Sequence, residues 1–320
     1  MAAQQGDFMQ RLSAILLAAC SLALAAPAQA LDLGIIAFQM SSDTHARVAN
    51  AARDAAEAKG WDVTLLNSAG AMPDHAAQIE NLTQAGVDAI IVAMGKPIET
   101  DAQLAAAREA GIPVITVMSG GSPETLFDIQ VNEYQVGAQA ALYLLGLIDY
   151  EGAILTERFE GNVGTRIRGK VLDTVLSENP QVEVIGSHAM ARTKSWREDV
   201  RAGMEALLLQ NQGNVDGIWA SFDGQAFIID DLLTAAGATK GSPALVSIDG
   251  GPEAYERIAD PDSMLLATVA IPFEAMGEKA VEMVGAIVED GADPATLVSG
   301  PYLLMDAELV DANNVAQHAQ

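Results

Sequence analysis

The sequence predicts an α/β protein made of two similar, doubly wound parallel-sheet lobes. Three observations predict it: short β-branched apolar segments alternate with alanine-rich helical segments, glycine or proline bounds almost every segment, and Gly120-Gly121-Ser122-Pro123 divides the alternation into two series. The helical segments are long enough to act as right-handed crossovers between parallel strands. A single eight-fold barrel is the alternative architecture, since its strand count is compatible with the same alternation.

The first strand–loop–helix unit, from Leu33 to Trp61, sets the pattern for the rest of the chain. LDLGIIAF is a short, nearly unbroken apolar run that predicts a buried parallel strand. The polar stretch that follows leads into a helix, which Ser42 or Asp43 is placed to cap and Gly60 ends. The loop of such a unit lies at the carboxyl end of its strand, where open α/β sheets bind ligands.

The remaining elements continue this alternation. Before and across the break, strands are predicted at 62–67, 88–94, 113–117 and 127–131, and helices at 73–85, 98–110 and 134–147. In the second series, strands are predicted at 153–156, 182–187, 217–220, 244–248, 264–270 and 302–305, and helices at 164–177, 196–209, 225–236 and 274–289. The late helix and final strand indicate that the chain crosses back between lobes, through tight connections that suit a hinge.

Residues 1–30 are predicted to be a cleavable export signal. Arg11 precedes a run of small and apolar residues at 12–26, and Ala28-Gln29-Ala30 is an A-x-A cleavage pattern, which places the cut after Ala30. The apolar run is too short for a comfortable membrane span. A buried core helix is the alternative interpretation of this segment.

Two further alternatives concern the same segment. Met9 could be the true start instead of Met1, because it gives a compact basic front. Leu17-Ala18-Ala19-Cys20 is similar to a lipoprotein cleavage box, so a lipid anchor at Cys20 is the alternative to cleavage after Ala30. With cleavage after Ala30, the mature chain holds no cysteine, and therefore no disulfide, thiol nucleophile or thiolate metal site.

Charge and composition exclude several classes of function. The chain carries 17 basic and 43 acidic residues, a formal net charge of −26, so phosphate backbones repel it and nucleic-acid binding is excluded. After residue 30 no apolar run reaches the length of a membrane helix. The length that remains is ample for two medium-sized lobes. These features indicate an acidic, exported protein.

An exported sugar-acting enzyme is the competing functional class, and the sequence holds little that supports it. No G-x-S-x-G elbow, H-E-x-x-H pair, P-loop or strand-following G-x-G-x-x-G occurs. The four histidines, at positions 45, 75, 188 and 318, lack the spacing of a metal site. We therefore predict no catalytic activity, no metal and no cofactor.

An ordered set of segments resembles the periplasmic sugar-binding proteins of ABC importers, of the ribose-binding type. The segments are ARVANAARDAAEAKGW at 46–61, AREAGIPVITV at 107–117, VNEYQVGAQAALYL at 131–144, GTRIRG at 164–169, DGIWASFDGQA at 216–226, LVSIDG at 245–250 and LLATVAIPFEAMGEKAVE at 265–282. These proteins share their lobes with the effector domain of lac-repressor-type regulators. A DNA-reading regulator would begin with a basic helix-turn-helix instead of an export signal.

The resemblance implies a type I periplasmic-binding-protein fold, in which three crossings join the lobes and form a hinge. It places the crossings near Asn132-Glu133, Ile271-Pro272 and Gly300-Pro301. The first lobe would then hold residues 31–132 and 272–300, and the second lobe 133–271 and 301–320. It also implies a periplasmic monomer that closes around a sugar or polyol and delivers it to the membrane permease of an ABC importer. A receptor that feeds a chemoreceptor or sensor kinase is the alternative.

In the second lobe, the resemblance implies that Arg166 and Asp249 contact the ligand. A guanidinium offers several donors in a fixed plane, and a carboxylate at a strand's carboxyl end can accept two hydroxyl hydrogen bonds. Asp223 lies at the same place one strand earlier, where it either contacts the ligand or caps its helix. A surface position is the alternative for Arg166, and Arg168 is expected at the surface.

Three aromatic residues are further candidates. Trp196 begins a helix near the place where the family stacks a ring on the sugar, Phe222 replaces a common asparagine, and Phe273 follows a crossing. An ordinary core position is the alternative for each of them.

The first lobe departs from the ribose-binding pattern. Where that type has asparagine and two stacking aromatics, this chain has Ser42, Thr44 and His45, and Met118-Ser119 replaces an Asp-Arg pair. His45 could stack or hydrogen-bond, or be structural or exposed. These changes leave the ligand open among a smaller or more flexible polyol, another pentose and a hexose.

Overall fold

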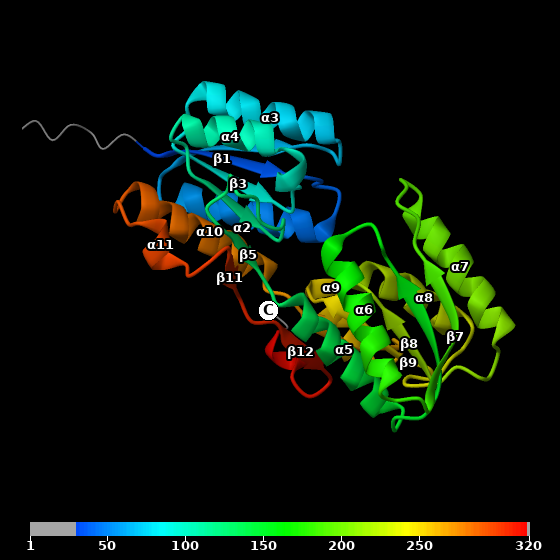
Figure 1. Ribbon diagram of the computed structural model, residues 1–320. Coiled ribbons are helices and arrows are strands. Elements are labelled where there is room, and N and C mark those ends of the chain that lie inside the picture. Colours follow the sequence, from blue (N-terminus) through cyan, green and yellow to red (C-terminus); the bar gives the residue numbers. More distant parts are fainter. Residues whose placement is uncertain (1–29, 319–320) are drawn as a thin grey trace, which may run out of the picture.

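The computed structural model describes residues 30–318 and shows two α/β lobes side by side, each built around a six-stranded sheet (Figure 1). The proposed export signal, its two possible starts and the Cys20 anchor lie outside the described residues. Two separate open sheets confirm the two-lobe prediction and rule out the closed barrel, which would need one continuous ring of strands.

The first lobe has an all-parallel sheet with the strand order β11-β5-β4-β3-β1-β2. Its strands are β1 (Asp32–Ala37), β2 (Asp62–Asn67), β3 (Ala89–Ala93), β4 (Val114–Val117), β5 (Asp128–Gln130) and β11 (Tyr302–Leu304). Its helices are α2 (Asp43–Ala58), α3 (Met72–Ala85), the 3₁₀ turn η1 (Pro97–Glu99), α4 (Asp101–Glu109), α10 (Phe273–Val288) and α11 (Pro294–Leu297). Helices α2 and α10 pack on one face of the sheet, and α3 and α4 pack on the other.

The second lobe has the strand order β12-β10-β9-β8-β6-β7, with β12 antiparallel to β10. Its strands are β6 (Gly152–Arg158), β7 (Val182–Ala189), β8 (Gly217–Ala220), β9 (Ala244–Asp249), β10 (Leu265–Ala270) and β12 (Glu308–Asp311). Its helices are α5 (Glu133–Leu147), α6 (Val163–Ser177), α7 (Trp196–Gln210), α8 (Asp223–Ala235), α9 (Pro252–Ala259) and the 3₁₀ turn η2 (Val315–Gln317). Helices α5 and α6 cover one face, and α7 and α8 cover the other.

The chain passes between the lobes three times. It leaves the first sheet after Gln130 and begins α5 of the second lobe at Glu133, and it returns between Ala270 at the end of β10 and Phe273 at the start of α10. Val131 and Ile271, which lie in these two crossings, are buried in one apolar cluster that runs through both lobes. The lobes therefore share a core at the crossings.

The third crossing lies at residues 305–307, so the predicted crossing at Gly300-Pro301 is wrong. Tyr302–Leu304 forms β11, which pairs in parallel with β5 of the first sheet, and the chain reaches the second sheet only at β12. The backbone N–H of Asp128 donates to the carbonyl of Pro301 at 2.9 Å, which ties Pro301 to the first lobe. The lobe boundary at 301 is corrected accordingly: residues 301–304 belong to the first lobe.

Between residues 30 and 318, we find no helix that combines the length and the apolar character needed to cross a bilayer.

Helices α2 and α10 approach each other closely enough that one position must be glycine. A Cβ atom on Gly277 of α10 would overlap the carbonyl oxygen of Val48 and lie 2.9 Å from the backbone nitrogen of Ala52. Both of these atoms are backbone atoms of α2 and cannot rotate away. Helix α2 begins at the loop that carries the first-lobe candidate residues. The contact with α10 therefore helps to fix the position of that loop.

We predict that Gly277→Ala lowers the free energy of unfolding by about 1–3 kcal/mol, because the added methyl group forces α2 and α10 apart. Gly146→Ala is the matched control, since a Cβ atom there meets nothing within 4 Å inside helix α5. That change should stabilise the protein slightly, by up to about 1 kcal/mol, through helix propensity. Denaturant unfolding of both variants checks the pair, and equal effects would contradict the close approach.

Candidate functional site

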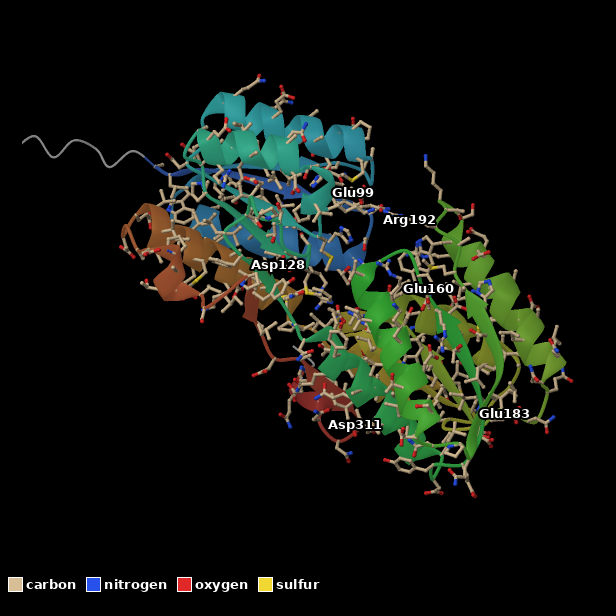
Figure 2. All side chains as sticks on the ribbon, in the orientation of Figure 1. Glu99, Asp128, Glu160, Glu183, Arg192 and Asp311 are labelled. Atoms are coloured by element: carbon tan, nitrogen blue, oxygen red, sulfur yellow. The ribbon has the colours of Figure 1, made fainter. Side chains whose placement is uncertain are left out.

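The loops at the carboxyl ends of the two sheets lie opposite each other where the lobes meet. Arg47 of α2 donates from Nη1 to the carbonyl of Gly250, in the loop between β9 and α9, at 2.6 Å. Figure 2 shows Glu99 on the first lobe and Arg192 and Glu160 on the second lobe at these facing edges. Parallel α/β sheets place ligand-binding loops at this edge, so the region between the lobes is the candidate site.

His45 is the most distinctive first-lobe residue in this region. Its ring centroid lies 6.4 Å from that of Phe38, at the end of β1. Its Nδ1 atom is buried and has no hydrogen-bond partner among the described residues. Burial and, to a lesser extent, the charge of Arg192 from the second lobe lower the pKa of His45 to about 4. At neutral pH the imidazole is therefore uncharged and has an unused polar atom.

The other first-lobe candidates are partly committed to internal bonds. Ser42 occupies the N-cap position of α2 but makes no side-chain cap, and its hydroxyl lies 3.3 Å from that of Thr44. Met118 takes a positive φ of 49° after β4. Ser119 Oγ accepts from the N–H of Gly95 at 2.8 Å. The Ser119 side chain therefore connects the loops after β3 and β4. The Thr44 hydroxyl donates to Met94 Sδ at 3.6 Å, and the Met118 side chain packs against the core.

Asp128 holds the Met118–Gly120 loop in place. Its buried carboxylate accepts from the N–H groups of Ser119 and Gly120, each at 3.1 Å. Burial raises the pKa of Asp128 to about 6, although these hydrogen bonds act to lower it. The loop after β4 is thus shaped by a carboxylate on the neighbouring strand.

Arg166 lies at the start of α6, which begins where the side chain of Asn162 accepts from the N–H of Gly164 at 2.7 Å. The Arg166 guanidinium is partly exposed, and it donates through Nη1 to the carbonyl of Glu160 at 2.8 Å. Among the described residues no carboxylate lies within 4.0 Å of it. Its other N–H donors are therefore available to a ligand.

Arg168 is buried, so the expectation that it lies at the surface is wrong. Its guanidinium makes two bonds to Glu133, at 2.6 and 3.1 Å, and Nη1 donates to Asp249 Oδ1 and to the carbonyl of Ser221, both at 3.0 Å. Burial acts to lower the pKa of Arg168, but the charges of Glu133 and Asp249 outweigh it and raise the pKa above its usual value.

Asp249 ends β9 with an unusual positive φ of 135°. Arg168 holds its Oδ1 atom, and the side chain retains a 13% exposed fraction. Burial raises the pKa of Asp249 to about 7; the Arg168 charge opposes this shift, and the charges of Asp223 and Glu133 add to it. Asp249 thus has one oxygen fixed inside the lobe and the other free of protein donors among the described residues.

Asp223 serves the interior of the second lobe. Its carboxylate accepts from the hydroxyls of Ser247 and Thr268, at 2.5 and 2.7 Å, and from the N–H of Gly250 at 2.7 Å. The N-cap position of α8 is Phe222, so the alternative in which Asp223 caps this helix is wrong. Burial raises the pKa of Asp223. Because its oxygens are used internally, Asp223 fixes the Gly250 loop beside Asp249.

The second-lobe aromatic residues pack on one another. The Phe222 ring lies 5.7 Å from Trp196 and 6.2 Å from Phe159, and the Arg197 guanidinium lies 4.3 Å from the Trp196 ring centroid. Trp196 therefore has one face already occupied by a cation. Phe159 was not among the predicted residues, because it follows β6 without a recognisable motif.

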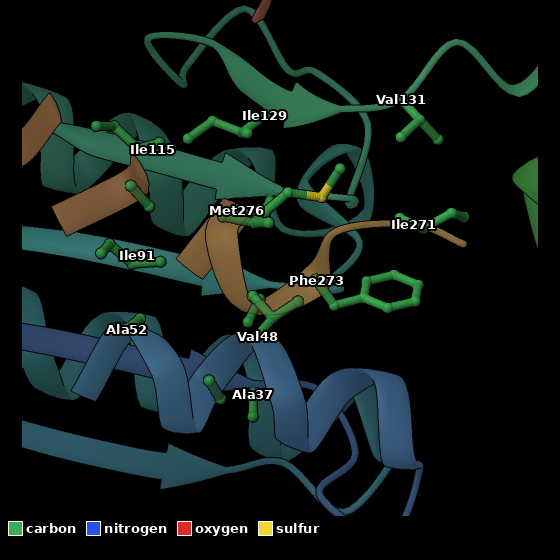
Figure 3. Packing of buried hydrophobic residues seen from close by; sticks show 14 of the residues in the cluster. Ala37, Val48, Ala52, Ile91, Ile115, Ile129, Val131, Ile271, Phe273 and Met276 are labelled. Atoms are coloured by element: carbon green, nitrogen blue, oxygen red, sulfur yellow. The ribbon is translucent and has the colours of Figure 1, made fainter. Parts of the chain in front are cut away.

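Phe273 belongs to the core. It is 1% exposed and packs at the start of α10 in the cluster that contains Val48 and Met276 (Figure 3). The Arg47 guanidinium lies 5.1 Å from its ring centroid. The predicted ligand contact at Phe273 is therefore wrong, and the core alternative holds. The Phe273 ring instead packs against the Arg47 guanidinium.

A buried acid that the sequence analysis did not single out lies at the end of β6. Glu157 is fully buried; its Oε2 lies 2.8 Å from His188 Nδ1, and its Oε1 accepts from Gln225 at 3.3 Å. Burial and, less strongly, the charge of Asp199 raise the pKa of Glu157 to about 9. The carboxyl group is thus protonated at neutral pH. Within residues 30–318, no three His, Cys, Asp or Glu side chains converge as metal ligands would.

Comparison with known proteins identifies one family and several relatives. A family model described as periplasmic binding protein domain matches residues 33–293. The xylitol-binding protein of Mycolicibacterium smegmatis is 30% identical over 182 residues, a segment that covers 55% of this chain and 50% of that protein. The ribose import binding protein RbsB of Bacillus subtilis is 25% identical over 257 residues, 78% of each chain.

Solved structures share the same architecture. A subunit of an ABC sugar transporter from Rhodobacter sphaeroides superimposes with a TM-score of 0.77 at 26% identity, over 89% of this chain and 99% of that one. A solute binding protein from Agrobacterium vitis, solved with bound allitol, has a TM-score of 0.77 at 24% identity, over 91% and 98% of the two chains. At 24% identity, the similarity to the Agrobacterium vitis protein shows the fold alone.

The pKa of Glu157 leads to a test of the second-lobe electrostatics. A carboxyl group whose pKa rises from 4.5 to about 9 on folding binds an extra proton in the folded state between these values. The contribution of this group to the free energy of unfolding is therefore fully present below pH ~4.5, and it is lost as the pH rises toward 9. We predict that Glu157→Gln removes this loss, so that its stability relative to the parent increases by about 1 kcal/mol or more between pH ~5 and pH ~8.

Glu183→Gln is the matched control, because Glu183 is an exposed glutamate on the neighbouring strand β7. Denaturant unfolding at several pH values measures both variants against the parent. A Glu157→Gln curve parallel to that of the parent would show that Glu157 is ionised in the folded protein.

Proposed function

Because the chain belongs to the periplasmic binding protein domain family, we propose that it is an exported receptor that closes around a sugar or polyol and delivers it to an ABC-type importer. The proposal is supported by the polar groups found at the carboxyl ends of the two sheets: a guanidinium with available donors at Arg166, a carboxylate with one free oxygen at Asp249 and a neutral imidazole at His45. The xylitol- and ribose-binding relatives support this ligand class.

The chemistry of the site suits a neutral ligand that carries several hydroxyl groups. Each hydroxyl both donates and accepts, so the same molecule can accept from Arg166 and donate to Asp249. His45 adds a small uncharged group on the opposite lobe, and Thr44 adds a hydroxyl. The apolar edges of a sugar or polyol can lie against Phe222 and Trp196. Such a set grips a flexible polyol without requiring a charge on it.

Closure follows from the division of these groups between lobes. A ligand that contacts both lobes binds the closed arrangement more tightly than the open one, and so shifts the population toward closure. Asn132-Glu133, Ile271-Pro272 and residues 305–307 are the proposed hinge. The closed surface is then what the permease recognises.

The proposal also covers the location, oligomeric state and partner of the receptor. We assign it no catalytic step. We place it in the periplasm as a monomer, exported by residues 1–30 and cleaved after Ala30. Delivery to a permease is favoured over a role that feeds only a chemoreceptor, because the ribose-binding relative is an import protein by name.

The ligand is found by a thermal-shift screen of the purified protein against pentoses, hexoses, polyols and cyclitols. A compound that binds only the folded state raises the melting temperature by mass action. We expect a clear rise with at least one compound. A flat screen would overturn the proposed ligand class.

We predict that Arg166→Ala weakens binding of that compound by about 10- to 100-fold, because a charge-assisted hydrogen bond contributes about 1.5–3 kcal/mol. The melting temperature without ligand should be unchanged, since the Arg166 guanidinium makes only one bond, to a nearby loop carbonyl. Isothermal titration calorimetry measures the affinity. Arg53→Ala is the control, because Arg53 pairs with the adjacent Asp54 on the surface of α2; equal losses in both variants would refute the assignment of Arg166.

A further inference from the structure

The Arg168 guanidinium joins parts of the second lobe that are far apart in the sequence. Its side chain is 4% exposed, and its partners are Glu133 at the start of α5, Ser221 after β8 and Asp249 at the end of β9. A planar guanidinium with five donors in a fixed fork can hold all three at once, whereas a lysine ammonium cannot match that geometry.

The first of these partners belongs to a crossing between lobes. Glu133 is the first residue of α5, directly after Asn132, whose side chain caps the helix. The fit is tight on both sides: a Cβ atom on Gly164 would overlap Glu133 Oε1, and one on Gly137 would lie 2.9 Å from Arg168 Cα. The two glycines let α5 and α6 approach, and the ion pair then fixes the second-lobe end of the first crossing.

The third partner belongs to another crossing. The carbonyl of Asp249 accepts from the N–H of Ile271 at 2.8 Å, and Ile271 lies in the second crossing. Asp249 itself takes a positive φ of 135°, which a residue other than glycine rarely adopts without support. The bond from Arg168 to its side chain and the bond from Ile271 to its carbonyl supply that support.

We propose that Arg168 is a positioning residue that locks the second-lobe ends of two crossings to Asp249, so that the hinge and the ligand-facing carboxylate form one rigid unit. The inference rests on the proposed function for its meaning, since only a protein that closes on a ligand needs this unit. Hinge rotation then occurs on the first-lobe side of the unit, and Asp249 keeps its orientation as the lobes move.

The electrostatics of the cluster are consistent with this role. Glu133 and Asp249 both contact the single guanidinium, Asp223 adds a third buried carboxylate nearby, and Arg47 of the first lobe lies close enough for its charge to interact with Asp249. Removal of the Arg168 fork leaves two buried carboxylates that repel each other. Both crossings would then lose their anchor together.

The test uses the ligand-free full chain, so that its failure is distinct from failure of the sugar screen. Spin labels are attached at Glu80→Cys on α3 and Glu205→Cys on α7, both exposed positions, with Cys20→Ser to remove the natural thiol. Double electron–electron resonance spectroscopy gives the distribution of distances between the two labels, and so between the lobes. Hydrogen exchange of the Ile271 amide gives the integrity of the second crossing.

Arg168→Lys keeps the charge but loses the fork. We expect a broader interlobe distribution with a new population, and exchange of the Ile271 amide faster by about 10-fold or more. Amides of β6, an interior strand paired with β7 and β8, should keep their protection; the amide of Ile154 is an example. Arg158→Lys is the matched control, since Arg158 makes a similar two-bonded ion pair with Asp173 in the same lobe, away from the crossings; it should match the parent.

Glu133→Gln covers the case in which Arg168→Lys does not fold. That change leaves the Arg168–Asp249 bond in place and weakens only the anchor of the first crossing, so the distance distribution should broaden while the Ile271 amide stays protected. Parent-like distributions in the folded variants would overturn the proposal.

Discussion

The second lobe depends on a single buried guanidinium. A charge taken out of water is tolerated only with partners that satisfy it, and Arg168 finds two carboxylates and a backbone carbonyl. Because residues two apart on a helix point to nearly opposite sides, the same segment that buries Arg168 leaves Arg166 partly exposed at the start of α6. One helix turn therefore supplies both an internal anchor and the group that we propose for ligand binding.

Buried carboxylates recur at the facing edges, and each has a defined task. Asp223 and Asp128 accept backbone N–H groups and so shape the loops after β9 and β4, whereas Asp249 is held on one side only. The overall charge of −26 keeps the protein away from polyanions. At the site itself, a neutral imidazole, one partly exposed guanidinium and one half-free carboxylate favour uncharged polyhydroxyl ligands.

Much of the fold could be predicted from the sequence, because alternation, turn residues and apolar runs act locally. The third crossing could not: β11 has only three residues, and nothing in Tyr302–Leu304 selects the edge of one sheet over the other. Nor could the roles of Arg166 and Arg168 be separated, since burial depends on Glu133, 35 residues away. Phe159 and Glu157 went unrecognised for the same reason, since their partners Phe222 and His188 come from distant segments of the sequence.

The central claim is that both lobes grip one ligand and close on it. Small-angle X-ray scattering during a titration with the most stabilising sugar or polyol tests this directly. The account predicts a radius of gyration that falls and levels off at one ligand per chain, because closure brings the two sheets' carboxyl edges together. Saturable binding with unchanged scattering would contradict it.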